Sequence, residues 1–162
     1  MHSELVNELP ITVDDFHGHT GQAPLLYVWE INTFPTRGDQ LLSLDECRTL
    51  ISRIWADQLN LSSPVPAVCD GRGSANARTR SSCIYLPRWA RNPVIVIHEL
   101  AHCVTDLFDE PDSIEHGRKF LKVYLTLLSS NTQYKYPALR SDALASGLKV
   151  SPIDIMRKLK GF

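Results

Sequence analysis

The chain has 162 residues, 43% of them hydrophobic and 22% charged, which suits one globular domain that buries its own core. Residues 1–15 carry acids where a cleaved export signal has a basic stretch and an apolar run, and no apolar segment approaches the length of a membrane span. These features argue against a membrane protein, and we expect a cytoplasmic one.

The formal net charge of −1 conceals an uneven distribution of charge along the chain. Residues 1–70 hold ten acids and three bases, residues 71–91 hold five arginines and no acid, and residues 117–162 hold nine bases and two acids. Such basic stretches can bind nucleic acid or an acidic partner, although solvated surfaces have the same composition. Arg72, Arg78 and Arg80 could bind phosphate or a substrate carboxylate, or lie on a solvated strand edge.

The sequence of the first third of the chain predicts a loosely ordered N-terminal segment, a strand and a helix. Residues 1–24 have weak periodicity, so we expect a loosely ordered lead-in before a single domain over residues 25–162. The stretch LLYVWEI (25–31) is apolar and rich in strand formers, which predicts a first strand. A helix is expected over residues 43–59, because SLDE at its start is a capping-box pattern that precedes a periodic apolar face.

Two further strands are expected in the middle of the chain. PAVCD (66–70) predicts a short strand, GRGSAN a turn, and ARTRSSCIYLP (77–87) one continuous strand. In that strand, Cys83 and Tyr85 would share one face, and their neighbours would share the other. Trp89 follows the strand and is expected to pack against the start of the next helix.

Helices are expected over most of the second half of the chain. Asn-Pro at 92–93 is a strong helix start, because Asn caps free amides and Pro suits the first helical position. The helix that it opens is expected to run to about residue 108. Two more are expected over residues 114–128 and 137–146, and a last short helix from residue 151.

The cysteines predict neither a disulfide framework nor a zinc ribbon, because they lie far apart and form no CxxC pair. They are Cys47, Cys69, Cys83 and Cys103. We expect reduced, mostly buried thiols. His17 and His19 lie in a polar stretch without a nearby cysteine and are expected to face solvent and not to hold a second metal.

The motif HELAH, from His98 to His102, lies in the apolar segment VIVIHELAHCV. Positions i and i+4 of a helix share a face about 6 Å apart, so the two imidazoles can face one ion. Glu99 lies one step round the helix and can reach a metal-activated water without ligating, as in HExxH zinc hydrolases. The motif also occurs by chance, but buried histidines and a buried glutamate would be costly in an apolar helix without partners, and a metal would supply the partner.

A catalytic zinc site usually has a third protein ligand. IEHGRKFLKVYLTLL places His116 in the first turn of the next helix, with Phe120 and Tyr124 on the same face. His116 is favoured over nearby carboxylates, because imidazole is the commoner zinc partner. The competing carboxylates are Glu115, Asp112 and Asp109.

Two tyrosines are candidates for stabilising a developing oxyanion. Tyr134 and Tyr136 lie downstream in NTQYKYP, in an expected loop, from which a phenol could donate a hydrogen bond. Tyrosines that precede a proline also commonly pack against the protein, which is the alternative interpretation.

HELAH, followed after a short acidic linker by HGRKF, resembles the SprT-like zincins, whose third ligand is the histidine of an HGxxF or HGxxW segment. The longer block CIYLPRWARNPVIVIHELAH…EHGRKF is similar to a group of small actinobacterial and phage-type HExxH metallohydrolases, in which LPxWAR precedes the zinc helix. The likeness covers about residues 71–128. It implies one zinc ion per chain, held by His98, His102 and His116, with Glu99 as the general base.

The resemblance also implies a fold and a way of binding substrate. The implied fold is an α+β minimal zincin, in which a small twisted sheet packs against the HExxH helix and further helices. Its edge strand, here within residues 79–86, can hold an extended peptide by strand addition. The chain lacks the CxxC pairs of the separate zinc ribbon in many SprT proteins, so their DNA-linked role transfers weakly.

The leading hypothesis is a zinc metallopeptidase that hydrolyses a protein or peptide amide bond. The alternative is a nucleic-acid-associated protein whose zinc site acts on DNA-bound proteins or is only structural. In a structural site, a fourth side chain such as Asp112 or Glu115 would complete the coordination.

Overall fold

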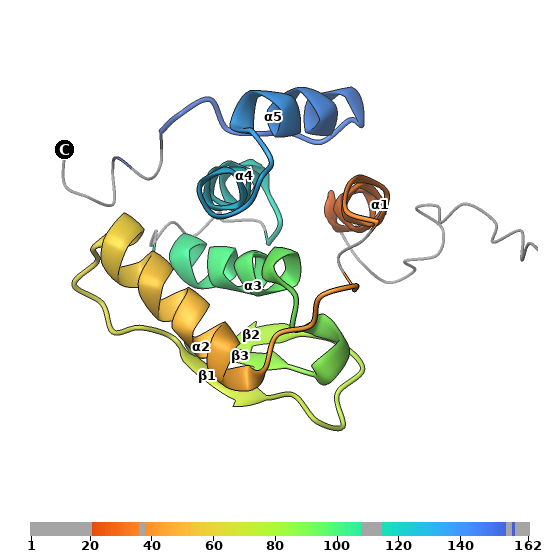
Figure 1. Ribbon diagram of the computed structural model, residues 1–162. Helices are drawn as coiled ribbons and strands as arrows, with labels where there is room; N and C mark the ends of the chain where they lie inside the picture. Colours follow the sequence, from red (N-terminus) through yellow and green to blue (C-terminus); the bar gives the residue numbers. More distant parts are fainter. Residues whose placement is uncertain (1–20, 36–37, 108–114, 155–156, 158–162) are drawn as a thin grey trace, which may run out of the picture.

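The computed structural model describes residues 21–35, 38–107, 115–154 and 157. These residues form a mixed α+β fold with five α-helices and a three-stranded sheet, which confirms the predicted α+β class (Figure 1). The helices are α1 (Ala23–Thr33), α2 (Leu44–Arg53), α3 (Pro93–Thr105), α4 (Arg118–Asn131) and α5 (Tyr136–Ala145). Within the described residues, no helix combines the length and the apolar character that crossing a bilayer requires.

The sheet has the order β1-β3-β2, with β3 in the centre. Its strands are β1 (Ala67–Asp70), β2 (Arg78–Arg80) and β3 (Cys83–Leu86). β3 pairs in parallel with β1 and antiparallel with β2, so β2 is an edge strand. Ile84 and Leu86 are fully buried, and Cys83 and Tyr85 are half-buried on the other face, as the alternation in the sequence predicts.

The prediction of one continuous strand over residues 77–87 was wrong. The segment is a tight hairpin, because Ser81 and Ser82 both have positive φ angles, 51° and 59°, and reverse the chain between β2 and β3. Two consecutive residues with positive φ form a type I′ turn, for which Asn-Gly and Asp-Gly are the usual sequences. Ser-Ser gives no such signal.

The prediction of a strand over residues 25–31 was also wrong, because this stretch lies within α1. The helix buries Ala23, Leu26 and Trp29, which recur every three residues along one side. Nε1 of Trp29 donates a 2.7 Å hydrogen bond to Asp142 on α5. Contacts with other helices therefore outweigh the strand preference of the local composition.

Local capping signals located two helix starts correctly. Ser43 and Glu46 form the expected capping box of α2, which a π-helical segment (Ile54–Leu59) extends. The Asn92 side chain accepts a 3.1 Å hydrogen bond from the amide of Ile95 and caps α3.

The expected helix ends were less accurate. α3 ends at Thr105, short of residue 108, and α4 begins at Arg118, later than residue 114. α5 begins and ends within one residue of the expected helix over 137–146. Residues 151–154 are not helical, and the rest of the expected last helix lies largely outside the described residues.

Helix α3 is the central element of the molecule. It lies between the sheet and α4, and α5 packs on the other side of α4 (Figure 1). Ile97 and Leu100 of α3 and Leu121 and Leu128 of α4 are fully buried. The HELAH segment therefore lies on a helix held on both sides, which restricts the side chains that it carries.

Candidate metal centre

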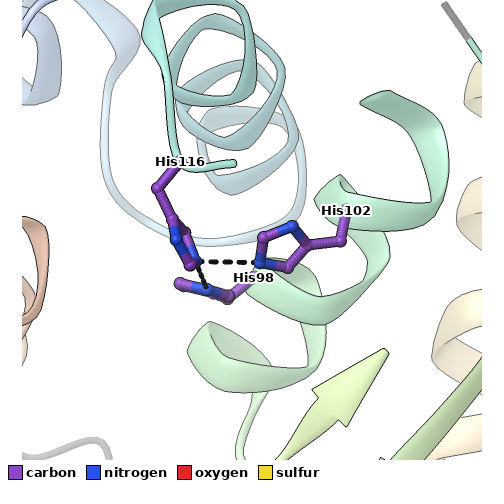
Figure 2. Close-up of side chains that lie close together, drawn as sticks. All are labelled: His98, His102 and His116. Carbon is purple, nitrogen blue, oxygen red and sulfur yellow. Dashed lines mark hydrogen bonds between the residues drawn. The ribbon is translucent and has the colours of Figure 1, made fainter. Parts of the chain in front are cut away.

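Three histidine side chains converge beside α3. His98 and His102 lie one turn apart on this helix, and His116 approaches from the turn before α4 (Figure 2). Nε2 of His116 lies 3.1 Å from Nε2 of His98 and 2.9 Å from Nε2 of His102. His98 and His116 are buried, and His102 is half-buried. The structure thus brings together all three histidines proposed from the sequence.

His116 reaches the site from a position that the sequence did not predict. We expected it in the first turn of a helix, but it precedes α4, and Gly117 is the residue that caps this helix. Its φ angle of 57° lies in the left-handed region, which is uncommon for a residue with a side chain. Nε2 of Gln22 donates a 2.7 Å hydrogen bond to the His116 carbonyl and helps to hold this conformation.

The donor set fits a zinc ion. Zn–N bonds of about 2.0–2.1 Å in a tetrahedral sphere place neighbouring ligand atoms about 3.3 Å apart, close to the Nε2 separations observed here. Burial, reinforced by the two neighbouring imidazoles, lowers the pKa of His102 to about 2, so its ring is neutral and free to ligate. Among the described residues, no carboxylate or thiolate joins this group. Glu115 is exposed, and the competing ligands Asp109 and Asp112 lie outside the described residues.

A carboxylate on α1 orients the first histidine. Oε1 of Glu30 lies 2.6 Å from Nδ1 of His98 and also accepts a 2.6 Å hydrogen bond from the Tyr124 hydroxyl. Burial opposes charge on both groups, but their mutual attraction outweighs it, raising the pKa of His98 and lowering that of Glu30. With a proton on Nδ1 directed at Glu30, Nε2 would be the atom available for a metal.

Sequence reasoning missed Glu30, because it lies in the stretch taken as a strand. The available signal was a single acid within the apolar run LLYVWEI. A buried acid needs a partner, so such a residue points to a contact that the local pattern does not contain.

Phe120 forms an apolar floor beneath the three imidazoles. Its ring centroid lies 4.5 Å from that of His102 and 5.0 Å from those of His98 and His116. Phe120 is only 1% exposed. These contacts leave the imidazoles little freedom to rotate away from a shared ion.

Glu99 lies beside the histidines but outside the potential ligand group. Its carboxylate is buried, and Oε2 lies 2.8 Å from the hydroxyl of Thr79 on β2. Burial raises the pKa of Glu99, although the charge of His98 and the hydrogen bond from Thr79 oppose the shift. A carboxylate with a raised pKa is suited to accept and release protons near neutral pH.

A cavity of about 920 Å³ opens over the histidines and Glu99. One wall is the segment from Ser74 to Thr79, and Tyr27 and Ile31 of α1 line another part. Trp89 also lines the cavity and is 51% exposed. Its indole is available to contact a bound molecule.

The structure does not bring the other proposed site residues to this cavity. Tyr134 packs edge-on against Phe34, with ring centroids 4.8 Å apart, and the Tyr136 hydroxyl accepts a 2.7 Å hydrogen bond from Lys122. Neither tyrosine lines the cavity, and neither does Arg80. Tyr27 and Arg78 are the tyrosine and the arginine among the lining residues.

Internal contacts occupy several arginines of the basic stretch. Arg72 and Arg91 both form ion pairs with Asp70, at 3.3 and 2.9 Å. The Arg78 guanidinium lies 5.0 Å from the centroid of the Tyr85 ring. His17 and His19 lie outside the described residues.

No protein-family model matches the chain, and no match was found among the curated proteins or the solved structures. The similarity to SprT-like zincins therefore stays a prediction that depends on the motifs.

Proposed function

We propose that this chain is a zinc-dependent metallopeptidase with a minimal zincin-like fold, which hydrolyses a protein or peptide amide bond. One observation carries the proposal: three Nε2 atoms converge at a cavity, with the buried Glu99 carboxylate beside them but outside the ligand group. A purely structural zinc site has four protein ligands, and it would not explain a buried carboxylate that lies beside the ligands without being one.

His98, His102 and His116 would hold the ion through Nε2, and the cavity leaves access for water and substrate. When bound, zinc would supply Lewis acidity, which makes a water molecule more acidic and a substrate carbonyl more electrophilic. The chain itself supplies the orientation of the ligands, through Glu30 on His98 and the hydrogen bond that holds the His116 backbone.

Glu99 would act as the general base and then as the general acid. Its carboxylate takes a proton from the attacking water and passes that proton to the nitrogen of the departing amine as the C–N bond breaks. Thr79 fixes one carboxylate oxygen, so the other can face the cavity. No further proton carrier is needed for this transfer.

Tyr27 is the residue best placed to stabilise the oxyanion, in place of Tyr134 or Tyr136. It lines the cavity, and its ring centroid lies 5.5 Å from that of His116. Burial, followed by the negative charge of Glu30 and two other carboxylates, raises the pKa of Tyr27 to about 12. The phenol therefore keeps its proton at neutral pH and remains a hydrogen-bond donor.

An extended peptide would bind along β2. This strand is an edge of the sheet, and two of its three residues, Arg78 and Thr79, line the cavity. Strand addition would supply backbone hydrogen bonds without regard to sequence, and the side-chain contacts would come from the cavity walls. Trp89 and Ile31 offer apolar surface for one substrate side chain.

A second candidate function, action on a protein bound to nucleic acid, draws on the arginines of β2. Arg78 lines the cavity and Arg80 is exposed on the same strand, which gives the site a basic border. Retention on DNA that weakens steeply with salt would support this candidate. Free passage through a DNA column at low salt would exclude it.

The test of the leading proposal uses chain purified without a metal-affinity tag. Metal content and cleavage of a mixed peptide library are measured for wild type, His116→Ala and Glu99→Gln. We expect zinc in the wild type and in Glu99→Gln, loss of zinc in His116→Ala, and cleavage by the wild type alone. Equal cleavage by Glu99→Gln, or no zinc binding by the wild type, would overturn the proposal.

A further inference from the structure

Two thiols meet on the outer face of the sheet. Sγ of Cys69 on β1 lies 2.6 Å from Sγ of Cys83 on β3, although both cysteines are free. In the parallel register, Cys83 pairs with Ala67 and Cys69 with Tyr85, so the two cysteines are diagonal neighbours on one face. Their sulfur atoms are only about half an ångström further apart than in a disulfide of about 2.05 Å.

The other two cysteines differ from this pair in burial. Cys69 and Cys83 are half-buried, whereas Cys47 and Cys103 are buried. Thiol exchange requires access to the reagent, so the buried thiols of Cys47 and Cys103 are poor reactants in the folded chain. All four cysteines are free, as expected, but only two of the four are buried.

The paired cysteines lie at the two ends of a functional segment. Between Cys69 and Cys83 the chain forms the turn after β1 and the edge strand β2, and residues 74–79 of this segment line the cavity. The segment also carries Thr79, whose hydroxyl contacts the Glu99 carboxylate. A bond between the two cysteines would make this cavity wall a closed covalent loop.

We propose that Cys69 and Cys83 are a modification site, at which a small-molecule disulfide reversibly oxidises the pair to an intramolecular disulfide. One thiolate attacks the reagent, forming a mixed disulfide and releasing one small thiol. The second cysteine then displaces the other small thiol. The pair loses two protons and two electrons, and the reagent is reduced to two thiols, so the exchange balances. The inference goes beyond the proposed function and does not depend on a catalytic centre.

The oxidised form would have a stiffer cavity wall. Cross-linking residues 69 and 83 removes conformations from the segment between them, because its two ends can no longer separate. Amide hydrogen exchange in residues 71–82 should therefore slow on oxidation. Exchange in α5, which lies on the other side of α4, should stay unchanged.

The test incubates the folded, full-length chain with mixtures of oxidised and reduced glutathione. Free thiols are then counted, the intact mass is measured, and the bonded peptides are mapped. We expect two of the four thiols to be lost, a mass lower by two hydrogen atoms, and a Cys69–Cys83 cross-link that dithiothreitol reverses. A parallel sample unfolded in urea shows that the same buffer is able to oxidise the chain.

Matched variants identify the thiols without relying on one substitution. Cys83→Ser should abolish the cross-link, and Cys47→Ala should leave it intact. The mapping of wild-type protein stands on its own if either variant fails to fold. Four surviving thiols in the folded wild type, a bond that involves Cys47 or Cys103, or a bond between two chains would each overturn the proposal.

Discussion

Oε1 of Glu30 lies 2.6 Å from Nδ1 of His98, and this contact joins two helices whose paired residues are 68 positions apart in the chain. The same oxygen accepts a hydrogen bond from Tyr124, so a residue from a third helix fixes the carboxylate. Partners of this kind orient metal-binding histidines, and their loss weakens metal binding.

Glu30→Gln is expected to lower zinc affinity by about 10- to 100-fold, because the neutral amide holds the Nδ1 proton of His98 less well. Competition with a chromophoric chelator measures the dissociation constant. Asp142→Asn is the matched control: it weakens the hydrogen bond from Trp29 that also holds α1, but it does not touch His98. Unchanged affinity in Glu30→Gln would contradict the role of the carboxylate.

Tyr27→Phe is expected to reduce kcat by about 100- to 1,000-fold while zinc content and KM stay close to wild type, as for loss of an oxyanion donor. The ring stays in place, so its packing against the histidines is kept. Steady-state kinetics on a substrate from the library provide the measurement. Tyr136→Phe serves as the control. Because Tyr136 does not line the cavity, this variant should be nearly as active as wild type.

Gly71→Ala is expected to destabilise the fold by about 1–3 kcal/mol, as overpacking does. A Cβ atom at Gly71 would lie 2.5 Å from the backbone nitrogen of Pro87 and 2.6 Å from its Cδ, and a proline ring cannot move aside easily. Urea denaturation gives the difference in unfolding free energy. Gly38→Ala is the control: nothing lies within 4 Å of its added Cβ, so its stability should match wild type.

The capping box of α2 is expected to make the free energy of unfolding depend on pH in the acid range. The backbone amide and side chain of Ser43 hold the pKa of Glu46 below its ordinary value of 4.5. The contribution of Glu46 is therefore complete above its unfolded pKa and is lost as the pH falls through the lowered, folded pKa. Denaturation at several pH values should show Glu46→Gln less stable than wild type above pH 4.5, with the gap closing in stronger acid. A gap that is constant with pH would contradict this linkage.

The features predicted correctly from the sequence are those with a short-range signal. SLDE and Asn-Pro satisfy free backbone amides within a few residues, so the starts of α2 and α3 can be located locally. The spacing of His98 and His102 follows from the helical repeat. His116 was identified by residue type, but the local sequence HGRKF does not predict its left-handed backbone conformation.

The features that were missed depend on contacts between distant segments. α1 has the composition of a strand, and contacts with other helices decide its structure. Glu30 and Tyr27 reach the candidate site only because this helix lies beside α3. The Ser81-Ser82 turn was missed because neither serine favours positive φ on its own.

The contacts that tie α1 to the histidines also bear on the order in which the molecule assembles. Glu30 reaches Tyr124, and Gln22 reaches His116, across 94 residues in each case, whereas the histidine pairs span only 18 and 14. Closing the longer loops costs more chain entropy and slows folding. A refolding chain should therefore bring α3 and α4 together first. Tight binding of the proposed zinc ion should develop later, when α1 docks.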